Sequence, residues 1–349
     1  MPYYNYFLYF CTMKRPDFQS HKFCMRQLHG WSRVTYWCLW SIVWTLSLIP
    51  LRILYVFSDV MFLLVYYVVD YRKKLVRRNL RDSFPDKSEK ELRGIERRFY
   101  RWFCDYMIET LAIASMSEEE IKRRITFKNI EHTNKLFEQG YNVALYMSHY
   151  CNWEYVISIG LHLPKEVWAS QVVHELDYKP LDSIFLKLRS SMGTESVTRD
   201  VALRWIIRTT RQQQRKVLVG FISDQSPIYQ STHYWTNFLN HPDTLVLTGT
   251  ERIAKQCNFA CVYLDMTRIR RGYYEASIIP ITANSKEVPD WEITEKYFRL
   301  VEENILRAPE YWLWTHNRWK RDLAGLKAYN ATVNKTHNRT DANKQEKTE

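Results

Sequence analysis

The feature that most constrains the fold is a short polar box between two apolar runs in the middle of the chain. Residues 141–147 read Tyr-Asn-Val-Ala-Leu-Tyr-Met, which is typical of a buried strand, and residues 153–160 are apolar enough for a buried helix. The box between them ends in Asn152, a residue that favours the N-cap position of a helix. This order predicts a strand, a turn and a helix, the unit from which α/β sheets are built.

His149 lies in this turn, and Glu154 lies in the first turn of the expected helix. A neutral imidazole can take a proton from a hydroxyl near pH 7, and a carboxylate on its other ring nitrogen fixes the tautomer. Within one continuous helix the two side chains would point about 140° apart, so they meet only if His149 precedes the helix. We therefore predict that His149 activates an alcohol and that Glu154 orients it. The alternative is a surface histidine followed by a glutamate that the helix dipole favours.

Alternating apolar patterns predict a longer α/β region around this unit. Further strands are expected at 166–173, 216–223, 259–266 and 273–280, and further helices at 179–190, 200–213, 247–256 and 291–307. Capping boxes at Ser88 and Ser117 predict the starts of two earlier helices. The order indicates a sheet with crossover helices over 71–325, followed by a disordered polar tail over 326–349.

The N-terminal part differs in character. Residues 1–33 show no clear periodicity, whereas 34–70 is strongly apolar and is interrupted at Pro50, Arg52 and Asp59. A spanning helix needs about 20 mostly apolar residues, and 35–54 nearly qualifies. We predict that 34–70 anchors the protein in a membrane as a hairpin or helix pair. A helix pair in the core of a soluble protein is the alternative.

Charge and composition fit a membrane surface. The net charge is +12, aromatic residues make up 15% of the chain, and six basic residues lie within 71–81, directly after the apolar segment. Basic residues in that place favour the cytoplasmic side and contact with anionic lipid, although a solvated helix face has the same pattern. No helix-turn-helix, zinc-finger or RNP signature is present, which argues against nucleic acid as a partner.

The seven cysteines are scattered along the chain and show no paired spacing, which argues against a disulfide framework. This pattern favours a reducing compartment. Cys257 and Cys261 lack a second ligand pair, so they predict no metal site. The sequence holds no glycine-rich phosphate loop, and we expect no cofactor.

Several blocks, in a fixed order, resemble one enzyme family. They are RNLRDSFP at 78–85, SHYCNWE at 148–154, the segment 178–193 with KPL and LKLR, SDQSP at 223–227 and YWLWTHNRWK at 311–320. Together they are similar to the lipid A biosynthesis acyltransferases, the lauroyl and myristoyl transferases of Gram-negative bacteria, within the lysophospholipid acyltransferase superfamily.

The resemblance implies a glycerolipid-acyltransferase-like α/β sandwich with a mixed sheet and surrounding helices. It implies transfer of a fatty acyl chain from acyl carrier protein to a hydroxyl of a lipid A precursor, at the cytoplasmic face of the bacterial inner membrane. Cys151 in place of the usual Gly and Asn317 in place of the usual Arg leave the acceptor and the acyl chain open. A lysophospholipid or lyso-aminolipid acceptor is the alternative, and a non-catalytic membrane adaptor is a third hypothesis.

Further residues receive roles from these blocks. Asp224 and Gln225 follow a strand, where loops of open α/β sheets face the ligand, so Asp224 is expected to orient Arg189 or the acceptor. Arg189 is expected to bind phosphate or to pair with Glu154, and Arg318 to hold a phosphate of the sugar lipid.

The backbone near Asn152, or the Arg189 side chain, is expected to stabilise the oxyanion. A competing hypothesis makes Cys151 the nucleophile of an acyl-thioester route.

Overall fold

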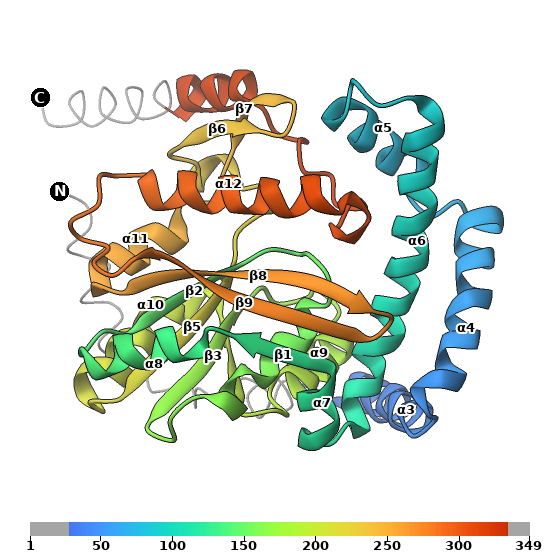
Figure 1. The fold of residues 1–349 in the computed structure, drawn as a ribbon, viewed down its shortest axis with the longest axis horizontal. Coiled ribbons are helices and arrows are strands. Elements are labelled where there is room, and N and C mark those ends of the chain that lie inside the picture. Colours follow the sequence, from blue (N-terminus) through green and yellow to red (C-terminus); the bar gives the residue numbers. More distant parts are fainter. Residues whose placement is uncertain (1–27, 334–349) are drawn as a thin grey trace, which may run out of the picture.

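The computed structural model of the protein describes residues 28–333. A seven-stranded sheet lies at its centre, with strands in the order β1-β9-β8-β2-β5-β3-β4 (Figure 1). The bounds are β1 Ile125–Lys128, β2 Val143–Met147, β3 Val167–Val173, β4 Thr194–Thr198, β5 Lys216–Ile222, β8 Ala260–Arg270 and β9 Tyr273–Thr282. Neighbouring strands run parallel, except that β8 and β9 form an antiparallel hairpin, so the sheet is mixed, as predicted.

The strands predicted from the apolar runs are all present. All five residues of β2 are buried, which means that the centre of the sheet is covered on both faces. Four short strands were not predicted: β1 and β4 at the two edges of the sheet, and a separate ribbon of β6 (Trp235–Phe238) and β7 (His241–Leu245). Because edge strands are only partly buried, they carry a weaker apolar pattern than central ones.

Helices surround the sheet. They are α5 Lys73–Ser83, α6 Glu89–Ala112, α7 Glu118–Arg124, α8 Ile130–Glu138, α9 Lys179–Arg189, α10 Ala202–Ile207, α11 Gly249–Cys257 and α12 Glu292–Arg307. The capping box of α6 is formed as predicted, because Ser88 Oγ accepts from the Glu91 backbone and Glu91 accepts from the Ser88 backbone. Ser117 caps α7 by accepting from the backbone of Glu120.

The helix expected at 153–161 is a 3-10 helix, η3, over Trp153–His162. It passes very close to the turn between α9 and β4, where Gly193 has a φ of +79°. A Cβ atom on Gly160 would lie 2.2 Å from the Gly193 carbonyl oxygen, so this approach requires glycine. The contact holds η3 against the turn between α9 and β4.

The N-terminal apolar segment forms two helices that meet at Pro50. They are α3 (Gly30–Ser47) and α4 (Leu51–Leu63), and α4 continues as a π-helical turn, η1 (Leu64–Val68). The predicted helix pair is present, and Pro50, the N-cap of α4, separates the two helices within the range 35–54 that nearly qualified as a spanning helix. Within the described residues, the helix that is long and apolar enough to cross a membrane is Leu51–Val68.

At the other end, residues 323–333 are helical, so the tail predicted to be disordered from 326 starts with an ordered stretch. Its remainder, like positions 1–27 of the predicted N-terminal extension, lies outside the described residues.

Candidate active site

The site is built where two neighbouring strands end. β2 and β5 are parallel, and Met147 at the end of β2 is paired with Ile222 at the end of β5. His149 and Asp224 each lie two residues beyond this pair, at the carboxyl edge of the sheet. Loops at that edge of an open α/β sheet face the ligand, and the register places these two side chains next to each other.

Asp224 holds His149 by two contacts. Its Oδ1 lies 2.6 Å from Nδ1 of the imidazole, and its Oδ2 accepts a 2.9 Å hydrogen bond from the His149 backbone N–H. Trp312 donates from Nε1 to the same Oδ2 at 2.8 Å. Burial raises the pKa of Asp224, but the His149 ring and these donors outweigh burial, so the net pKa lies below the usual value. The carboxylate is therefore ionised at neutral pH and accepts from Nδ1–H, which leaves Nε2 without a proton.

The second ring nitrogen faces Gln225. The side-chain amide nitrogen of Gln225 lies 3.2 Å from His149 Nε2 and can donate to its lone pair. The His149 side chain is 18% exposed, whereas that of Asp224 is buried. Trp153 packs edge-on against the imidazole, with 5.1 Å between the ring centroids. The basic nitrogen is thus on the accessible side of the ring, and the carboxylate is on the buried side.

Among the described residues, Glu154 forms no hydrogen bond or ion pair with the imidazole, so the prediction that it orients His149 is corrected. Its carboxylate forms a bidentate pair with Arg189, at 2.8 Å to Nε and 2.5 Å to Nη2. Trp153 and Tyr106 also donate to it, at 3.1 and 3.4 Å. A planar guanidinium matches two carboxylate oxygens at once, which a single imidazole nitrogen does not. Of the two roles expected for Arg189, pairing with Glu154 is the one found.

The Glu154–Arg189 pair connects η3 to the end of α9. Burial raises the pKa of Glu154, but Arg189 outweighs burial and brings the net pKa below its usual value. For Arg189, burial lowers the pKa, but the charge and hydrogen bonds of Glu154 raise it by more, so the net pKa lies above its usual value. Both groups are therefore charged at neutral pH, and Arg189 is committed to Glu154 rather than free to stabilise an oxyanion.

Two residues expected to bind substrate are buried instead. Asn152 does not cap η3 with its side chain and donates from Nδ2 to Glu109 Oε2 at 2.8 Å. Arg318 is 1% exposed and donates from Nη2 to the Leu245 carbonyl at 2.8 Å. Burial lowers the pKa of Arg318 to about 10. The expectation that Arg318 holds a phosphate is corrected, because its guanidinium is enclosed by the protein.

Trp312 was not predicted as a site residue. It lies in the block 311–320, where the charged residues had seemed the natural candidates. Trp312 forms an antiparallel bridge with Tyr150, and the backbone N–H of Leu313 donates to the His149 carbonyl at 3.2 Å. The block therefore lies directly on the turn that holds His149. The three tryptophans within it were the signal that was available in the sequence.

Cys151 is a poor candidate for a nucleophile. Its side chain is fully buried, and burial raises the pKa of the thiol above its usual value, so the reactive thiolate is scarce at neutral pH. Its backbone has a φ of 53°, in the left-handed region. That conformation explains why glycine suits this position of the box and shows that Cys151 fills the same turn.

No group of three or more His, Cys, Asp or Glu side chains within residues 28–333 has a geometry suited to a metal ion.

Comparison with known proteins gives two matches. The family model described as "Bacterial lipid A biosynthesis acyltransferase" matches residues 22–321. The "Lipid A biosynthesis lauroyltransferase" of Escherichia coli (strain K12) is 21% identical over 298 residues, which cover 83% of this chain and 94% of the relative. The matched range includes the strand ends, η3 and the block around Trp312.

Proposed function

Because the chain belongs to the bacterial lipid A biosynthesis acyltransferase family, and is therefore an acyltransferase, we propose that it acylates a hydroxyl of a lipid A precursor. The proposed donor is a fatty acyl thioester on acyl carrier protein, and His149 is the proposed general base. The observation that carries the proposal is the 2.6 Å contact between His149 Nδ1 and the buried Asp224 carboxylate. It fixes the tautomer in which Nε2 can accept a proton.

In the proposed reaction, His149 Nε2 takes the proton of the acceptor hydroxyl as its oxygen attacks the thioester carbonyl. The tetrahedral intermediate then expels the thiolate of the donor, and the imidazolium returns the proton to that sulfur. Asp224 stabilises the imidazolium while it carries the proton. His149 thus acts as the base in the first step and as the acid in the second.

Gln225 is proposed to assist the same step. In the free protein its amide lies on His149 Nε2, the position that the acceptor hydroxyl must take. Once the hydroxyl replaces it, the amide N–H is available to donate to the developing oxyanion. Such donors typically contribute about 10²–10³ in rate. Glu154 and Arg189 are proposed to hold η3 and α9 in place around the base.

The proposed setting is the cytoplasmic face of the inner membrane. Lipid A acyltransferases are membrane-associated in bacteria, and the basic residues after the apolar segment favour that orientation. Acyl carrier protein is acidic, so the net charge of +12 would attract it as well as anionic lipid.

The alternative acceptor is a lysophospholipid or lyso-aminolipid. Arg318, the residue expected to hold a sugar-lipid phosphate, is enclosed in the protein. A lysophospholipid headgroup carries a phosphate as well, so this burial favours neither acceptor over the other. The reaction at His149 would be the same for either acceptor.

The test is a lipid profile. Lipids of a deletion strain, complemented with the wild-type protein or with His149→Ala, are compared by mass spectrometry. Under-acylated lipid A in the deletion and His149→Ala strains supports the proposal, and accumulated lyso-lipid supports the alternative. We expect His149→Ala to lower the transfer rate by about 10²–10⁴ with the fold intact. Wild-type rates in a folded His149→Ala protein would remove the base role.

A further inference from the structure

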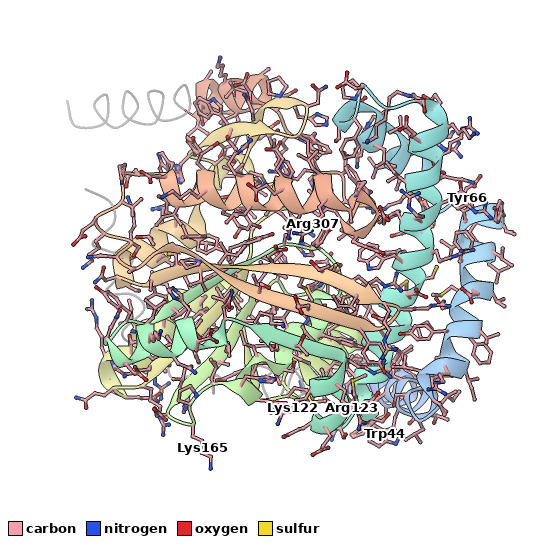
Figure 2. The ribbon with its side chains drawn as sticks, in the orientation of Figure 1. Trp44, Tyr66, Lys122, Arg123, Lys165 and Arg307 are labelled. Atoms are coloured by element: carbon pink, nitrogen blue, oxygen red, sulfur yellow. The ribbon has the colours of Figure 1, made fainter. Side chains whose placement is uncertain are left out.

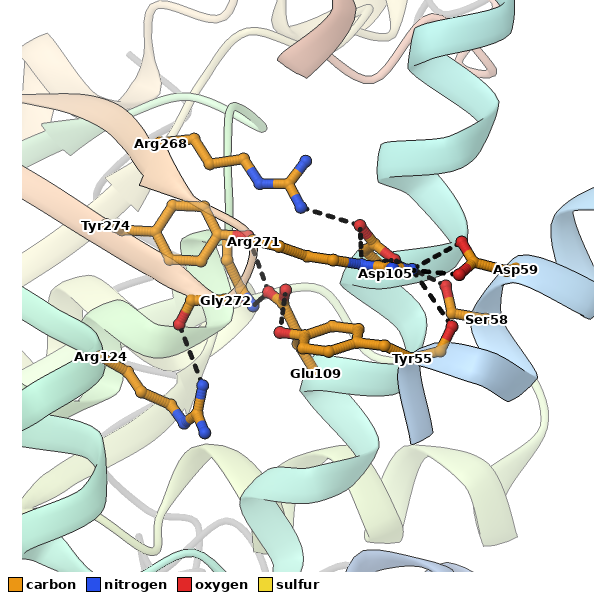
Figure 3. Close-up of polar contacts among 11 residues, drawn as sticks. Tyr55, Ser58, Asp59, Asp105, Glu109, Arg124, Arg268, Arg271, Gly272 and Tyr274 are labelled. Atoms are coloured by element: carbon orange, nitrogen blue, oxygen red, sulfur yellow. Dashed lines mark hydrogen bonds and ion pairs between the residues drawn. The ribbon is translucent and has the colours of Figure 1, made fainter. Parts of the chain in front are cut away.

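Near its middle, the apolar helix α4 forms a hydrogen bond and an ion pair with charged residues of α6 and of the β8–β9 hairpin. Ser58 donates to Asp105 of α6 at 2.7 Å, and Asp59 pairs with Arg271 at 2.9 Å (Figure 3). Arg271 and Arg268, from the β8–β9 hairpin, both pair with Asp105, at 2.6 and 2.8 Å. Asp59 lies at the middle of the segment Leu51–Val68, about 12 Å along the axis from either end.

α4 and its continuation η1 also contact α6, near the start of α4 and within η1. Tyr55 donates to Glu109 at 2.9 Å, and Tyr66 packs against Tyr100 with 5.4 Å between the ring centroids. Between these contacts, Arg101 lies 5.1 Å from the ring of Phe62. α4 therefore runs antiparallel to α6, with one side against protein over its whole length.

The opposite side of α4 is an exposed apolar stripe. Its members recur every three or four residues along the helix: Ile53, Val56, Phe57, Val60, Leu63, Leu64, Tyr67 and Val68. α3 continues the apolar surface with exposed Trp31, Val34, Trp37, Ile42 and Trp44. Both helices lie at one edge of the molecule, where Figure 1 views α3 nearly end-on and α4 from the side. Figure 2 shows Trp44 and Tyr66 at the two ends of this edge.

We propose that α3 and α4 lie in a single leaflet, along the plane of the membrane, and that neither helix crosses it. This inference rests on the proposed membrane function and adds its geometry. If α4 crossed the bilayer, the ion pairs of Asp59, Asp105, Arg268 and Arg271 would lie near its centre. The end of the β8–β9 hairpin would lie there with them. Charges are costly at that depth, and lipid-exposed sheet edges do not occur there.

A leaflet fits the chemistry of this surface better than a second copy of the chain. Tryptophan and tyrosine favour the boundary between headgroups and acyl chains, and they are frequent on this face. α5 follows with exposed Lys74, Arg77, Arg78 and Arg81, which complement anionic headgroups. The same basic residues, with a net charge of +12, would repel another copy of this protein.

The test uses the sidedness of labelling. Leu48→Cys, in the turn between α3 and α4, and Val69→Cys, just after η1, are placed separately in a protein whose other accessible cysteines are serine. Both positions are exposed. An impermeant maleimide is applied to spheroplasts and to inverted inner-membrane vesicles, and Lys165→Cys on the catalytic region serves as a cytoplasmic control.

We expect Val69→Cys and Lys165→Cys to react only in inverted vesicles, and Leu48→Cys to remain unreactive in spheroplasts. Reaction of Leu48→Cys in spheroplasts, with Val69→Cys reactive in inverted vesicles, would show that α4 crosses the membrane and would overturn the inference. Recovery of the protein as a soluble dimer after lysis would overturn it as well.

The lipid profile of the same cells separates this inference from the proposed function. A crossing α4 with normal acylation would remove the one-leaflet geometry alone. The expected labelling without any acylation would remove the proposed function alone.

Discussion

At the residue scale, two buried carboxylates lie near His149, and their surroundings give them different tasks. Asp224 accepts from the imidazole, the His149 backbone and Trp312, whereas Glu154 is neutralised by Arg189. The first arrangement stabilises a proton on His149, and the second stabilises the contact between η3 and α9. Substitution of each carboxylate by its amide should therefore have a different effect.

Asp224→Asn is expected to lower the transfer rate by about 10²–10⁴. The amide has no charge to stabilise the imidazolium, and its NH₂ group can donate to Nδ1 and favour the wrong tautomer. Asparagine can still accept from Trp312, so we expect the fold to persist. The measurement is product formation from acyl carrier protein thioester, beside a circular-dichroism melt. Near wild-type turnover in this variant would contradict the orienting role.

Glu154→Gln should act mainly on stability. It leaves Arg189 without its counter-charge, and breaking a buried pair costs about 3–5 kcal/mol. The pKa of Glu154 is lower in the folded protein than in the unfolded chain, where it is about 4.3. The ionised carboxylate therefore contributes its full stabilisation above that pH, and this stabilisation is lost as the pH falls through the folded pKa.

Unfolding by urea at pH 7 and at about pH 3 checks this pH dependence. The wild-type protein should lose more stability on acidification than Glu154→Gln. The exposed Glu131→Gln is the control and should behave as wild type. Equal acid sensitivity of wild type and Glu154→Gln would argue against an ionised Glu154 in the pair.

At the scale of elements, α6 links α4 to the turn that holds His149. Its Asp105 binds the β8–β9 hairpin, and its Glu109 accepts from Tyr55 of α4, from Tyr274 and from Asn152, which lies between His149 and Glu154. Burial raises the pKa of Glu109, and the hydrogen bonds from Tyr274 and Asn152 make that increase smaller. The start of α6 is set by its own capping box, so its stability can be varied far from these contacts.

Ser88→Ala is expected to lower the free energy of unfolding by about 1 kcal/mol, because the Glu91 backbone N–H loses its acceptor. Ser88→Thr keeps a hydroxyl that accepts from the Glu91 backbone and donates to the Glu91 carboxylate, so it should stay close to wild type. Denaturant unfolding in detergent gives the comparison. If both variants lose the same stability, the cap is not the cause.

At the scale of the whole molecule, the net charge of +12 and the apolar edge of α3 and α4 both favour an anionic lipid surface. The basic residues of α5 follow that edge directly along the chain. Each basic residue near an anionic surface contributes about 1 kcal/mol to binding. Removal of two such residues should therefore be measurable.

Lys74→Gln combined with Arg78→Gln is expected to weaken binding to vesicles that contain phosphatidylglycerol by roughly 30-fold at low salt. The loss should shrink as salt is added, because screening weakens the wild-type attraction. Lys165→Gln, an exposed lysine on the catalytic region, is the matched control (Figure 2). Co-sedimentation with vesicles measures the effect, and equal losses in both variants would contradict a localised basic surface.

The sequence by itself determined the local plan: the strand before His149, the helical turn after it, the capping boxes, and the ordered blocks of the family. These follow from apolar periodicity and from side chains a few residues apart. It could not assign the carboxylate beside His149, because Asp224 is 75 positions away and reaches the ring through the register of β2 and β5.

The tertiary structure alone also determined that Arg318 is buried and that Trp312 donates a hydrogen bond to Asp224. A basic residue in a short block looks the same in sequence whether it faces a phosphate or the core. Burial separates the two, and burial depends on contacts between segments far apart in the chain.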